Sequence, residues 1–566
     1  MAATKVWCFC PEVRDMSALQ SSRSPSSWLD IKWFSRHDDS TTQPSSDNPS
    51  DSYASLCEEL NALKHQFVPA SAACAESINN FHHQNGSKEK TNASFEFRRA
   101  RSVCNLYESL GRPTGQSKPR KFCKKRGRSS LSNSCSHSGL AQFVNRSAIK
   151  LANIDALLRF SLTNPHRQQI TAKPGEQQAD QQVAHSATQA EQHRYFAFAD
   201  LCGAPGGFSE YIMYRCTHPV KLIDEKIQTR NSNSSNNDSK QGNEYKDYYN
   251  NSICGGRDVT KINIPCHGFG MSLIGSNEDG AGVSWDCNHL QIYHLSSAED
   301  SRPSATRTNS EIDYSHVFYQ VCNGSDGTGD IYNWDNVLCL RRQMIETLSR
   351  ISLEENDRGS NREDQIAIDD ALGLVHLVVA DGGFDAQRDS TSQEQLALRV
   401  IVCQTAAALT LLKPGGNFVL KMFGFQLERT KRVLQHLYDN FEKMTFVKPI
   451  LSRPASAERY LVCCGYGGQS KGWNGRLWRK EMMEETQCSH ETEKSVAQKN
   501  CNYSDLNTLM NVFDIQMLQL NIDACQSILD HLNKRNIAAQ RGDASAVYQQ
   551  KEDTDLQIYK KLWQLW

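Results

Sequence analysis

Apolar residues in this chain gather into short stretches that are separated by long polar segments. Residues 195–201 (YFAFADL) predict a strand that runs into a turn containing glycine and proline. Residues 374–380 (LVHLVVA) predict a buried strand. Residues 417–421 (NFVLK) predict another strand, which follows the helix-ending sequence KPGG at 413–416. Several short strands are therefore expected in the middle of the chain.

Helical patterns alternate with these strands. Residues 143–160 place apolar side chains at helical spacing, residues 209–215 predict the start of a helix, and residues 392–412 predict a long one. Strands that alternate with helices indicate an α/β domain with a mostly parallel sheet. The pattern changes near the end of the sequence, where residues 512–532 and 556–566 predict helices without comparable strands.

The polar segments set the expected domain boundaries. Residues 1–90 are predicted to be mostly disordered, because their stretch 17–54 is rich in serine, aspartate and proline. Residues 91–465 are expected to form the α/β domain, and residues 466–566 a C-terminal helical region. Low-complexity insertions in surface loops of the α/β domain are expected, because loop-closure entropy grows only slowly with loop length. These insertions span about residues 112–138, 166–194, 224–251 and 296–310.

Composition narrows the class of protein. Of the 566 residues 38% are hydrophobic, and no apolar run approaches the roughly 18 residues that a membrane span needs. The first residues lack a signal-peptide pattern, so neither a membrane protein nor a conventionally secreted one is expected. The twenty cysteines are expected to be reduced, and because they form no CxxC…CxxC ladder, no metal site is predicted.

Charge is balanced over the whole chain but not locally. The 63 basic and 64 acidic residues give a net charge of −1, whereas residues 98–128 contain eleven lysines and arginines and a single acid. Binding to an anionic partner must therefore come from local patches. The run 118–128 (KPRKFCKKRGR) is interpreted as a nuclear-localisation signal with some attraction for RNA phosphates, although a solvated loop has the same composition.

A glycine-rich turn follows the first predicted strand. In residues 200–210 (DLCGAPGGFSE), glycines between a strand and a helix allow the backbone to approach a bound cofactor closely. The turn is not the G-x-G-x-x-G dinucleotide fingerprint, which disfavours an NAD or FAD enzyme. In an α/β sheet this turn lies at the carboxyl ends of the strands, where ligands bind.

These residues resemble a known family. The stretch 199–211 (ADLCGAPGGFSEY) is similar to the S-adenosylmethionine loop of FtsJ/RrmJ-type 2′-O-ribose methyltransferases, and most similar to the eukaryotic cap-specific mRNA (nucleoside-2′-O-)-methyltransferase 1 family. The resemblance extends over about residues 95–465 and implies a Rossmann-like class I methyltransferase fold. Further matching stretches follow in order: 100–108 (AR…NLYE), 145–150 (NRSAIK), 327–331 (GTGDI), 380–384 (ADGGF) and 452–460 (SRPASAERY).

The family's catalytic residues form a Lys-Asp-Lys-Glu tetrad, and the resemblance assigns it to Lys150, Asp381, Lys421 and Glu458. Methyl transfer to a ribose hydroxyl needs that hydroxyl to be aligned with the methyl group and to lose a poorly acidic proton. A lysine can accept this proton only if its pKa is lowered, by desolvation or by a second cation. Lys421 is therefore predicted to be the base, with Lys150 and Asp381 tuning it.

Each of these charges alone is also typical of a solvent-exposed position, since an isolated lysine on a helix or an acid after a strand is common on surfaces. A pair such as Glu458 and Arg459 on a surface contributes under about 1 kcal/mol. The joint pattern favours a site, because Asp381 and Lys421 both follow apolar strands at the edge where α/β sheets bind ligands.

The resemblance also implies how S-adenosylmethionine binds. The methionine and ribose portions are expected to lie against Cys202, Gly203, Ala204, Pro205, Gly206, Gly207 and Phe208. Asp330 is expected to accept the adenine amino group, with Ile331 beside the ring, although a flexible glycine loop at 324–329 is an equal interpretation of the residues alone. Residues 268–273 (GFGMSL) offer no acid for the ribose hydroxyls.

Contacts to RNA are implied at other positions. Arg101 and Asn145 are expected to contact the cap phosphates or the first nucleotides, and Glu458 the nucleotide or Lys421. The family's guanine-contacting Glu-Asn pair is replaced by Ser390 and Thr391, a departure that leaves guanine recognition open.

The predicted function is methylation of the first transcribed nucleotide of capped mRNA, from cap 0 to cap 1, in the nucleus. The expected partners are the capped mRNA 5′ end and the transcription or capping machinery, with no membrane. One alternative is the same chemistry on another RNA, namely the second cap nucleotide, rRNA or tRNA. A second is a catalytically inactive RNA-binding scaffold, and a third is an NAD enzyme on a similar sheet.

Overall fold

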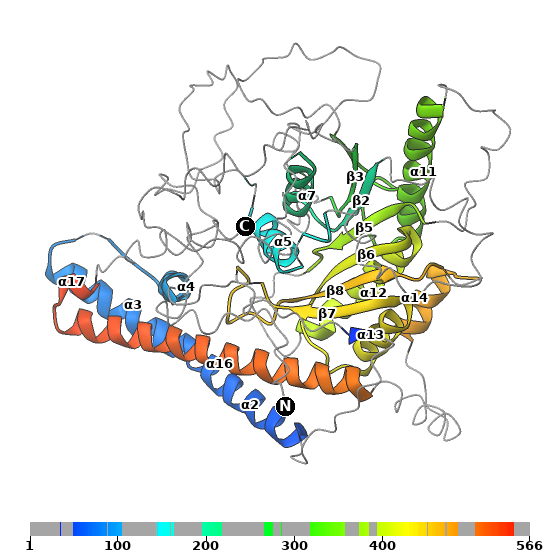
Figure 1. The fold of residues 1–566 in the computed structure, drawn as a ribbon. Helices are drawn as coiled ribbons and strands as arrows, with labels where there is room; N and C mark the ends of the chain where they lie inside the picture. Colours follow the sequence, from blue (N-terminus) through cyan, green and yellow to red (C-terminus); the bar gives the residue numbers. More distant parts are fainter. Residues whose placement is uncertain are drawn as a thin grey trace, which may run out of the picture.

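In the computed structural model the described residues are 34–35, 49–87, 89–104, 143, 145–158, 160–163, 195–217, 265–274, 285, 317–356, 373–383, 393–449, 451–469, 472–484 and 504–547. They form a twisted sheet with helices on both faces and a separate group of long helices along one side (Figure 1). No helix within these ranges has the length and apolar character needed to cross a bilayer.

The central sheet has eight strands in the order β1-β7-β8-β6-β5-β2-β3-β4. Strands β4, β3, β2, β5 and β6 pair in parallel, whereas β8 pairs antiparallel with both β6 and β7. Strand β7 therefore runs in the same direction as β6, and the short β1 is antiparallel to β7. The bounds are Phe34–Ser35 (β1), Phe196–Leu201 (β2), Cys266–Met271 (β3), Val317–Val321 (β4), Val375–Ala380 (β5), Leu412–Met422 (β6), Phe441–Val447 (β7) and Arg459–Tyr466 (β8).

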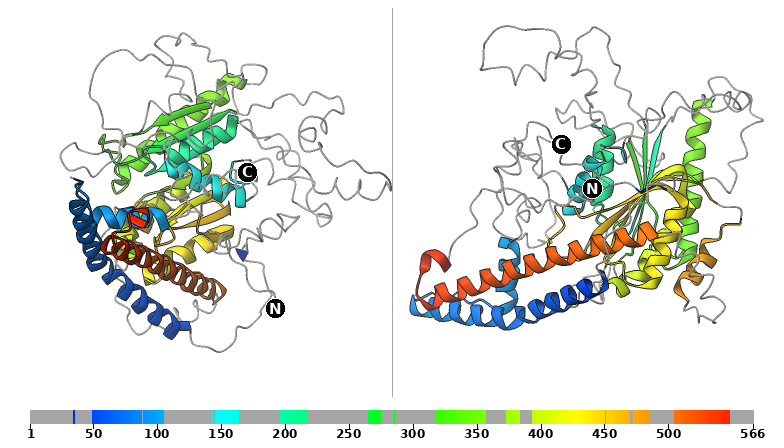
Figure 2. Two further views of the ribbon diagram at one scale, coloured as in Figure 1. Left: turned by 90° about the vertical axis from the view of Figure 1, so that its left-hand side faces the viewer. Right: turned by 60° about the horizontal axis from the view of Figure 1, so that its bottom comes forward.

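Helices cover both faces of this sheet, as the end-on view in Figure 2 shows. On one face lie α5 (Arg146–Leu157) and α7 (Gly207–Thr217). The opposite face carries α11 (Trp334–Asn356), α12 (Gln393–Leu411), α13 (Glu428–Asn440) and α14 (Gly475–Met483). The predicted Rossmann-like α/β fold with a mostly parallel sheet is confirmed.

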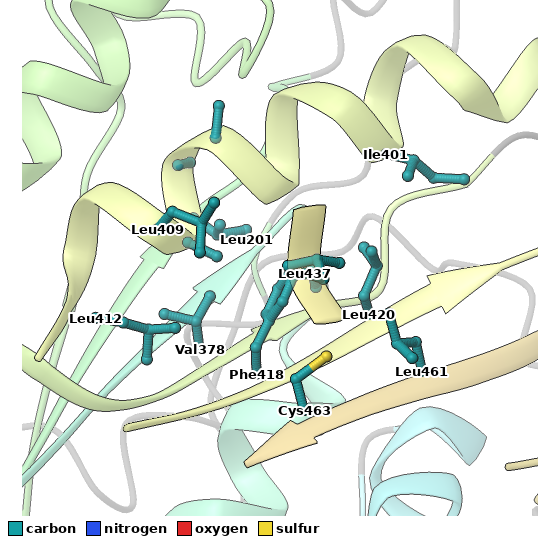
Figure 3. Close-up of a cluster of buried hydrophobic side chains, with 14 of the residues drawn as sticks. Leu201, Val378, Ile401, Leu409, Leu412, Phe418, Leu420, Leu437, Leu461 and Cys463 are labelled. Carbon is teal, nitrogen blue, oxygen red and sulfur yellow. The ribbon is translucent and has the colours of Figure 1, made fainter. Parts of the chain in front are cut away.

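The larger core lies between the sheet and α12 and α13 (Figure 3). Val378, Phe418 and Leu461 of three adjacent strands point toward Leu409 and Leu437 of the helices, and all five are at most 1% exposed. Helix α12 is buried along most of its length, because a sheet of parallel strands must be covered on both faces. This packing fixes the positions at which β5 and β6 end.

The local predictions succeed for the elements nearest the glycine-rich turn. Strands β2 and β5 and helices α5, α7 and α12 occur where the apolar spacing placed them. Strand β6 begins at Leu412, so KPGG belongs to the strand, with a shift in register against β5 between Val375 and Leu377. Strands β1, β3, β4, β7 and β8 were not predicted.

The prediction of a mostly disordered N-terminal region is wrong for Pro49–His65 (α2) and Phe67–Gln84 (α3), which are helices. Both pack against α16 (Ser504–Gln540), and α4 (Ala93–Cys104) and α17 (Ala544–Val547) complete this group, called here the helical unit (Figure 1). The physical reason is that the apolar faces of α2 and α3 pack mainly against α16, over 400 residues away. Helix α16 contains the predicted helix 512–532, and residues 556–566 lie outside the described residues.

The order of the strands locates the ligand-binding edge. From β2 the chain adds β3 and then β4 on one side of the sheet, and it adds β5 and then β6 on the other side of β2. The order in which strands are added therefore reverses between β2 and β5. Such a switch point opens a crevice beyond the carboxyl ends of the two strands. The glycine-rich turn and Asp381 follow these two ends directly.

Candidate active site

The glycine-rich turn connects β2 to α7 and lies against the start of α5. Gly206 has a φ of 109°, a conformation that residues with a Cβ rarely adopt. A Cβ on Gly207 would come within 2.1 Å of Asn145 Oδ1, so the two segments touch only because position 207 is glycine. Asn145 itself caps α5 by accepting a hydrogen bond from Ser147 N at 2.9 Å. The turn and α5 are thereby locked together.

Asp200 lies buried at the end of β2, beneath this turn. Its Oδ2 accepts hydrogen bonds from Ser209 N at 3.2 Å and Ser209 Oγ at 2.7 Å, whereas its Oδ1 has no protein donor. Burial, assisted by the negative charge of Asp381, raises the pKa of Asp200 to about 7. A buried carboxylate oxygen without a donor is suited to a ligand that brings an ammonium group or another donor.

The predicted adenine-binding loop follows β4 and is held by hydrogen bonds along its length. Buried Asn336 donates to Asp330 O at 3.0 Å and accepts from Ser325 Oγ at 3.1 Å. Hydrogen bonds from Thr328, chiefly from its side chain, lower the pKa of Asp326. Asp330 accepts a bond from Tyr332 N at 2.8 Å, and Ile331 belongs to the core. The loop therefore presents Asp330 at the same edge of the sheet as the glycine-rich turn.

The four predicted catalytic residues form two ion pairs. Lys150 Nζ lies 2.7 Å from Glu458 Oε1, and Lys421 Nζ lies 3.1 Å from Asp381 Oδ1. Lys421 also donates to the backbone oxygen of Asp381 at 2.6 Å. All four side chains are between 11% and 15% exposed, so they are largely buried but reachable. The structure thus brings together residues from α5, from β6, from the position directly after β5 and from the loop before β8.

Two further residues hold Asp381 and were missed from the sequence. Ser147 Oγ donates to Asp381 Oδ2 at 2.9 Å, and Tyr460 OH donates to Asp381 Oδ1 at 2.8 Å. Ser147 lies one helical turn before Lys150, so one face of α5 reaches both ion pairs. Both residues lie within stretches that match the family, NRSAIK and SRPASAERY, and this was the sequence feature that could have identified them.

The charge state of Lys421 differs from the prediction. Burial acts to lower the pKa of this ammonium group, but the negative charges of Asp381 and Glu458 and the hydrogen bond with Asp381 outweigh it. The pKa of Lys421 is therefore raised above its usual value, where the sequence argument required a lowered one. The reason is that the negative charges of two carboxylates, Asp381 and Glu458, favour the ammonium form of Lys421.

The electrostatics of Glu458 are dominated by lysines. Burial acts to raise its pKa, but Lys150, Lys421 and Lys448 together hold it well below its usual range. Lys448, which follows β7, was missed from the sequence. It is 3% exposed, and its Nζ donates to the backbone oxygens of Ser456 and Glu458, both at 2.7 Å. Burial, assisted by the charges of Arg459 and Lys150 and opposed by Glu458, lowers the pKa of Lys448 to about 7.

The predicted RNA contacts are distributed differently. Asn145 lies at the glycine-rich turn, as described above. Arg101 lies on α4 in the helical unit, where its guanidinium group is 5.8 Å from the centre of the Phe97 ring. Ser390, Thr391 and the basic run 118–128 lie outside the described residues. Among the residues that the structure does describe, no cluster of three or more histidine, cysteine or acidic side chains is suited to a metal ion.

The structure is a Rossmann-like α/β fold with a glycine-rich turn at its switch point and two lysine–carboxylate pairs beside that turn. The model of the FtsJ-like methyltransferase family matches residues 307–466, which include Asp381, Lys421 and Glu458. Residues 307–466 are thus similar to an FtsJ-like methyltransferase domain, which agrees with the resemblance of the motifs 327–331, 380–384 and 452–460.

Curated relatives extend this likeness upstream of the matched domain. The chain is 27% identical over 323 residues to cap-specific mRNA (nucleoside-2′-O-)-methyltransferase 1 from Mus musculus and 26% identical over 323 residues to that from Homo sapiens. Each alignment covers 57% of this chain and 26% of the relative. The protein of that name from Drosophila melanogaster is 26% identical over 368 residues, covering 65% of this chain and 29% of the relative. The chain therefore spans little more than a quarter of the length of these relatives.

Proposed function

We propose that this protein transfers a methyl group from S-adenosylmethionine to the ribose 2′-oxygen of the first transcribed nucleotide of capped mRNA, converting cap 0 to cap 1. The observation that supports this most is the pair of ion pairs, Lys150–Glu458 and Lys421–Asp381, at the sheet edge beside the glycine-rich turn. The names of the curated relatives supply the choice of capped mRNA.

The residues around the turn fit S-adenosylmethionine. When bound, this cofactor supplies an electrophilic methyl group on a positively charged sulfonium. The turn from Cys202 to Phe208 would hold its methionine and ribose, and the oxygen of Asp200 that has no protein donor suits its ammonium group. Asp330 and Ile331 would hold the adenine.

The two ion pairs would align and deprotonate the ribose hydroxyl. We assign Lys421 as the residue that, once it has released its own proton to solvent, hydrogen-bonds the 2′-hydroxyl as a neutral amine and accepts the hydroxyl proton. Its raised pKa holds it as an ammonium in the absence of ligand, and a positive charge placed beside it lowers that pKa. Asp381, fixed by Ser147 and Tyr460, orients Lys421, while Lys150 and Glu458 form the second wall of the site. Alignment of this kind supplies much of the rate enhancement in transfer reactions.

RNA would reach this edge from the side that carries α5. Asn145 and Glu458 would contact the first nucleotides, with Arg101, Ser390 and Thr391 as further contacts. We propose a nuclear location on the basis of the basic run 118–128, and the transcription or capping machinery as partners.

The test is methylation of matched RNAs by the purified protein with labelled S-adenosylmethionine. Transfer to cap 0 RNA, mapped to the first nucleotide and lost in Lys421→Ala, is the expected result. Equal transfer to capped and uncapped RNA would indicate another RNA substrate and overturn the cap assignment. Binding of RNA without any transfer would indicate an inactive scaffold. Transfer at the wild-type rate by Lys421→Ala would refute the role assigned to Lys421.

A further inference from the structure

Glu458 lies on a loop that connects β7 to β8, formed by residues 451–458 and called here the Glu458 loop. One side of this loop faces the ion pairs, through the contact of Glu458 with Lys150. The other side faces the helical unit, where Ala455 packs against buried side chains of α2, α3 and α16. The loop is therefore sandwiched between the site and a group of helices that the family match at 307–466 does not include.

Arg459, the next residue after Glu458, makes a buried ion pair with Asp514 of α16. The two residues are 4% and 2% exposed, so their charges depend on each other. The same guanidinium group donates from Nε to Ala457 O at 3.1 Å. One arginine thus joins α16 to the backbone on both sides of Glu458.

The surroundings of the pair restrict its geometry. The guanidinium carbon of Arg459 lies 4.8 Å from the centre of the Phe425 ring and 5.6 Å from that of Phe513, which neighbours Asp514 on α16. Asp514 Oδ2 accepts a hydrogen bond from Gln426 Nε2 at 2.5 Å. On α2, burial and then the charge of Asp514 raise the pKa of Tyr53, which places that helix beside the pair too. Aromatic and polar contacts together leave Arg459 little freedom.

The inner side of the loop is held by separate contacts. Lys448 donates to the backbone oxygens of Ser456 and Glu458, and Arg146 of α5 donates to Leu451 O at 2.6 Å. These bonds come from the methyltransferase domain itself. Arg459 joins the end of the loop to α16 through its ion pair with Asp514. Replacing Asp514 therefore removes this ion pair and leaves the hydrogen bonds from Lys448 and Arg146 in place.

We infer that Asp514 of α16 is a positioning residue for Glu458, acting through Arg459. The helical unit is then a part of the catalytic apparatus, because it sets the place of the carboxylate that pairs with Lys150. This inference rests on the proposed function for its activity readout, but the geometry of the loop can be measured without it.

The experiment compares Asp514→Asn with the wild-type protein, using Asp523→Asn as the matched control. Asp523 lies on the same helix and is exposed, where it accepts a hydrogen bond from Gln519. Asp514→Asn is expected to speed hydrogen exchange in residues 451–459 and to lower kcat on cap 0 RNA by about 10- to 100-fold, the scale of a displaced catalytic group. The KM for S-adenosylmethionine should change less than about twofold, because the cofactor loop is not affected. Asp523→Asn should match the wild type in hydrogen exchange, in kcat and in the KM for S-adenosylmethionine.

A second variant separates positioning from folding. Replacing the pair by apolar residues, Arg459→Met with Asp514→Leu, is expected to keep the unfolding temperature near that of the wild type, since buried ion pairs often tolerate such replacement. The kcat of this double variant should nevertheless stay low. The single variant Asp514→Glu, which keeps the carboxylate, should have a kcat between those of Asp514→Asn and the wild type. Wild-type exchange and kcat in both Asp514→Asn and the apolar variant would overturn the inference. If the wild-type protein transfers no methyl group to RNA, the proposed function is refuted but this inference is not. Hydrogen exchange in residues 451–459 would still show whether Asp514 positions the loop.

Discussion

At the scale of single residues, the carboxylate of Asp381 is held by three other residues. It accepts hydrogen bonds from Ser147, Tyr460 and Lys421, which come from a helix and two different strands. A carboxylate held by several donors is fixed in its orientation. The position of Lys421 therefore depends on Ser147 and Tyr460 as well as on Asp381.

Tyr460→Phe tests this dependence. The change removes one hydrogen bond to Asp381, so stability should fall by about 1.5–3 kcal/mol, the usual contribution of a bond to a charged group. Catalysis should fall through kcat rather than KM, as measured in the RNA methylation assay. Tyr466→Phe is the control on the same strand, because its hydroxyl donates only to Leu409 O at 3.2 Å. It should lose about 0.5–1.5 kcal/mol and keep its kcat; a fall in kcat as large as that of Tyr460→Phe would contradict the role given to Tyr460.

Lys448 predicts a particular dependence of stability on pH. Its pKa is about 7 in the folded protein and about 10.5 as a free side chain, so between these values the unfolded chain binds more protons. Stability from this residue therefore rises as the pH increases from about 7 to 10.5, and is constant below that window. In Lys448→Met this rise should disappear from urea unfolding curves measured across the window. Lys443→Met, an exposed position on β7, should retain it; equal slopes in all three proteins would show that Lys448 is not the cause.

At the scale of elements, the contact between α5 and the glycine-rich turn couples Ser147 and Lys150 to the proposed cofactor site. Helix α5 carries Ser147 and Lys150, and its N-cap Asn145 lies against Gly207. A shift of the turn must move the helix cap, and with it one wall of the active site. The helix and the turn are distant in sequence, and it is the close approach of a glycine that lets them meet.

Gly207→Ala should disturb both functions of this contact. A Cβ would meet Asn145 Oδ1 at 2.1 Å, so the asparagine must leave its capping position, at a cost of about 1 kcal/mol in helix stability. Weaker binding of S-adenosylmethionine is expected in calorimetry, together with a lower kcat. Gly467→Ala is the control, because its Cβ would find its nearest neighbour, Asn440 O, at 3.5 Å. If both variants bind the cofactor like the wild type, the turn does not need glycine at position 207.

At the scale of the whole molecule, α16 joins two hydrophobic cores. Its first half contributes Phe513 and Met517 to the core beneath α12 and α13, and its second half packs with α2, α3 and α4. A buried ion pair between Arg535 of α16 and Glu96 of α4, 2.9 Å long, ties the far end together. Because the two cores share one helix, the helical unit and the sheet are expected to unfold as one cooperative system.

Arg535→Met tests how much this second buried ion pair contributes to the free energy of unfolding. Removing the arginine leaves the Glu96 carboxylate buried without its cation, which should lower the free energy of unfolding by about 3–5 kcal/mol. Urea unfolding followed by circular dichroism measures the change. The control is Arg476→Met, whose partner Asp335 is 60% exposed, so that the loss should stay below about 1 kcal/mol. Equal losses in the two variants would mean that burial of the Arg535 pair is unimportant.

Local sequence determined the elements around the candidate site. The apolar runs of β2 and β5, the helical spacing of α5 and the glycine-rich turn are short-range patterns, and each occurs where it was expected. Lys150, Asp381 and Lys421 lie in or directly after such segments, whereas Glu458 was selected by its motif alone. The structure brings the four together, and their catalytic roles stay a prediction. The spacing of apolar residues and the residues of a turn are local features, so they can be recognised without knowledge of the tertiary structure.

Tertiary structure alone decided the rest. Helices α2 and α3 become ordered elements because α16 covers them, and no nearby residue signals that partner. The pKa of Lys421 rises because Asp381 and Glu458 converge on it from distant segments. Lys448, Arg459 and Asp514 are ordinary charged residues in the sequence, and burial turns them into supports of the Glu458 loop. Electrostatic and packing energies depend on distances through space, which the order of residues along the chain does not contain.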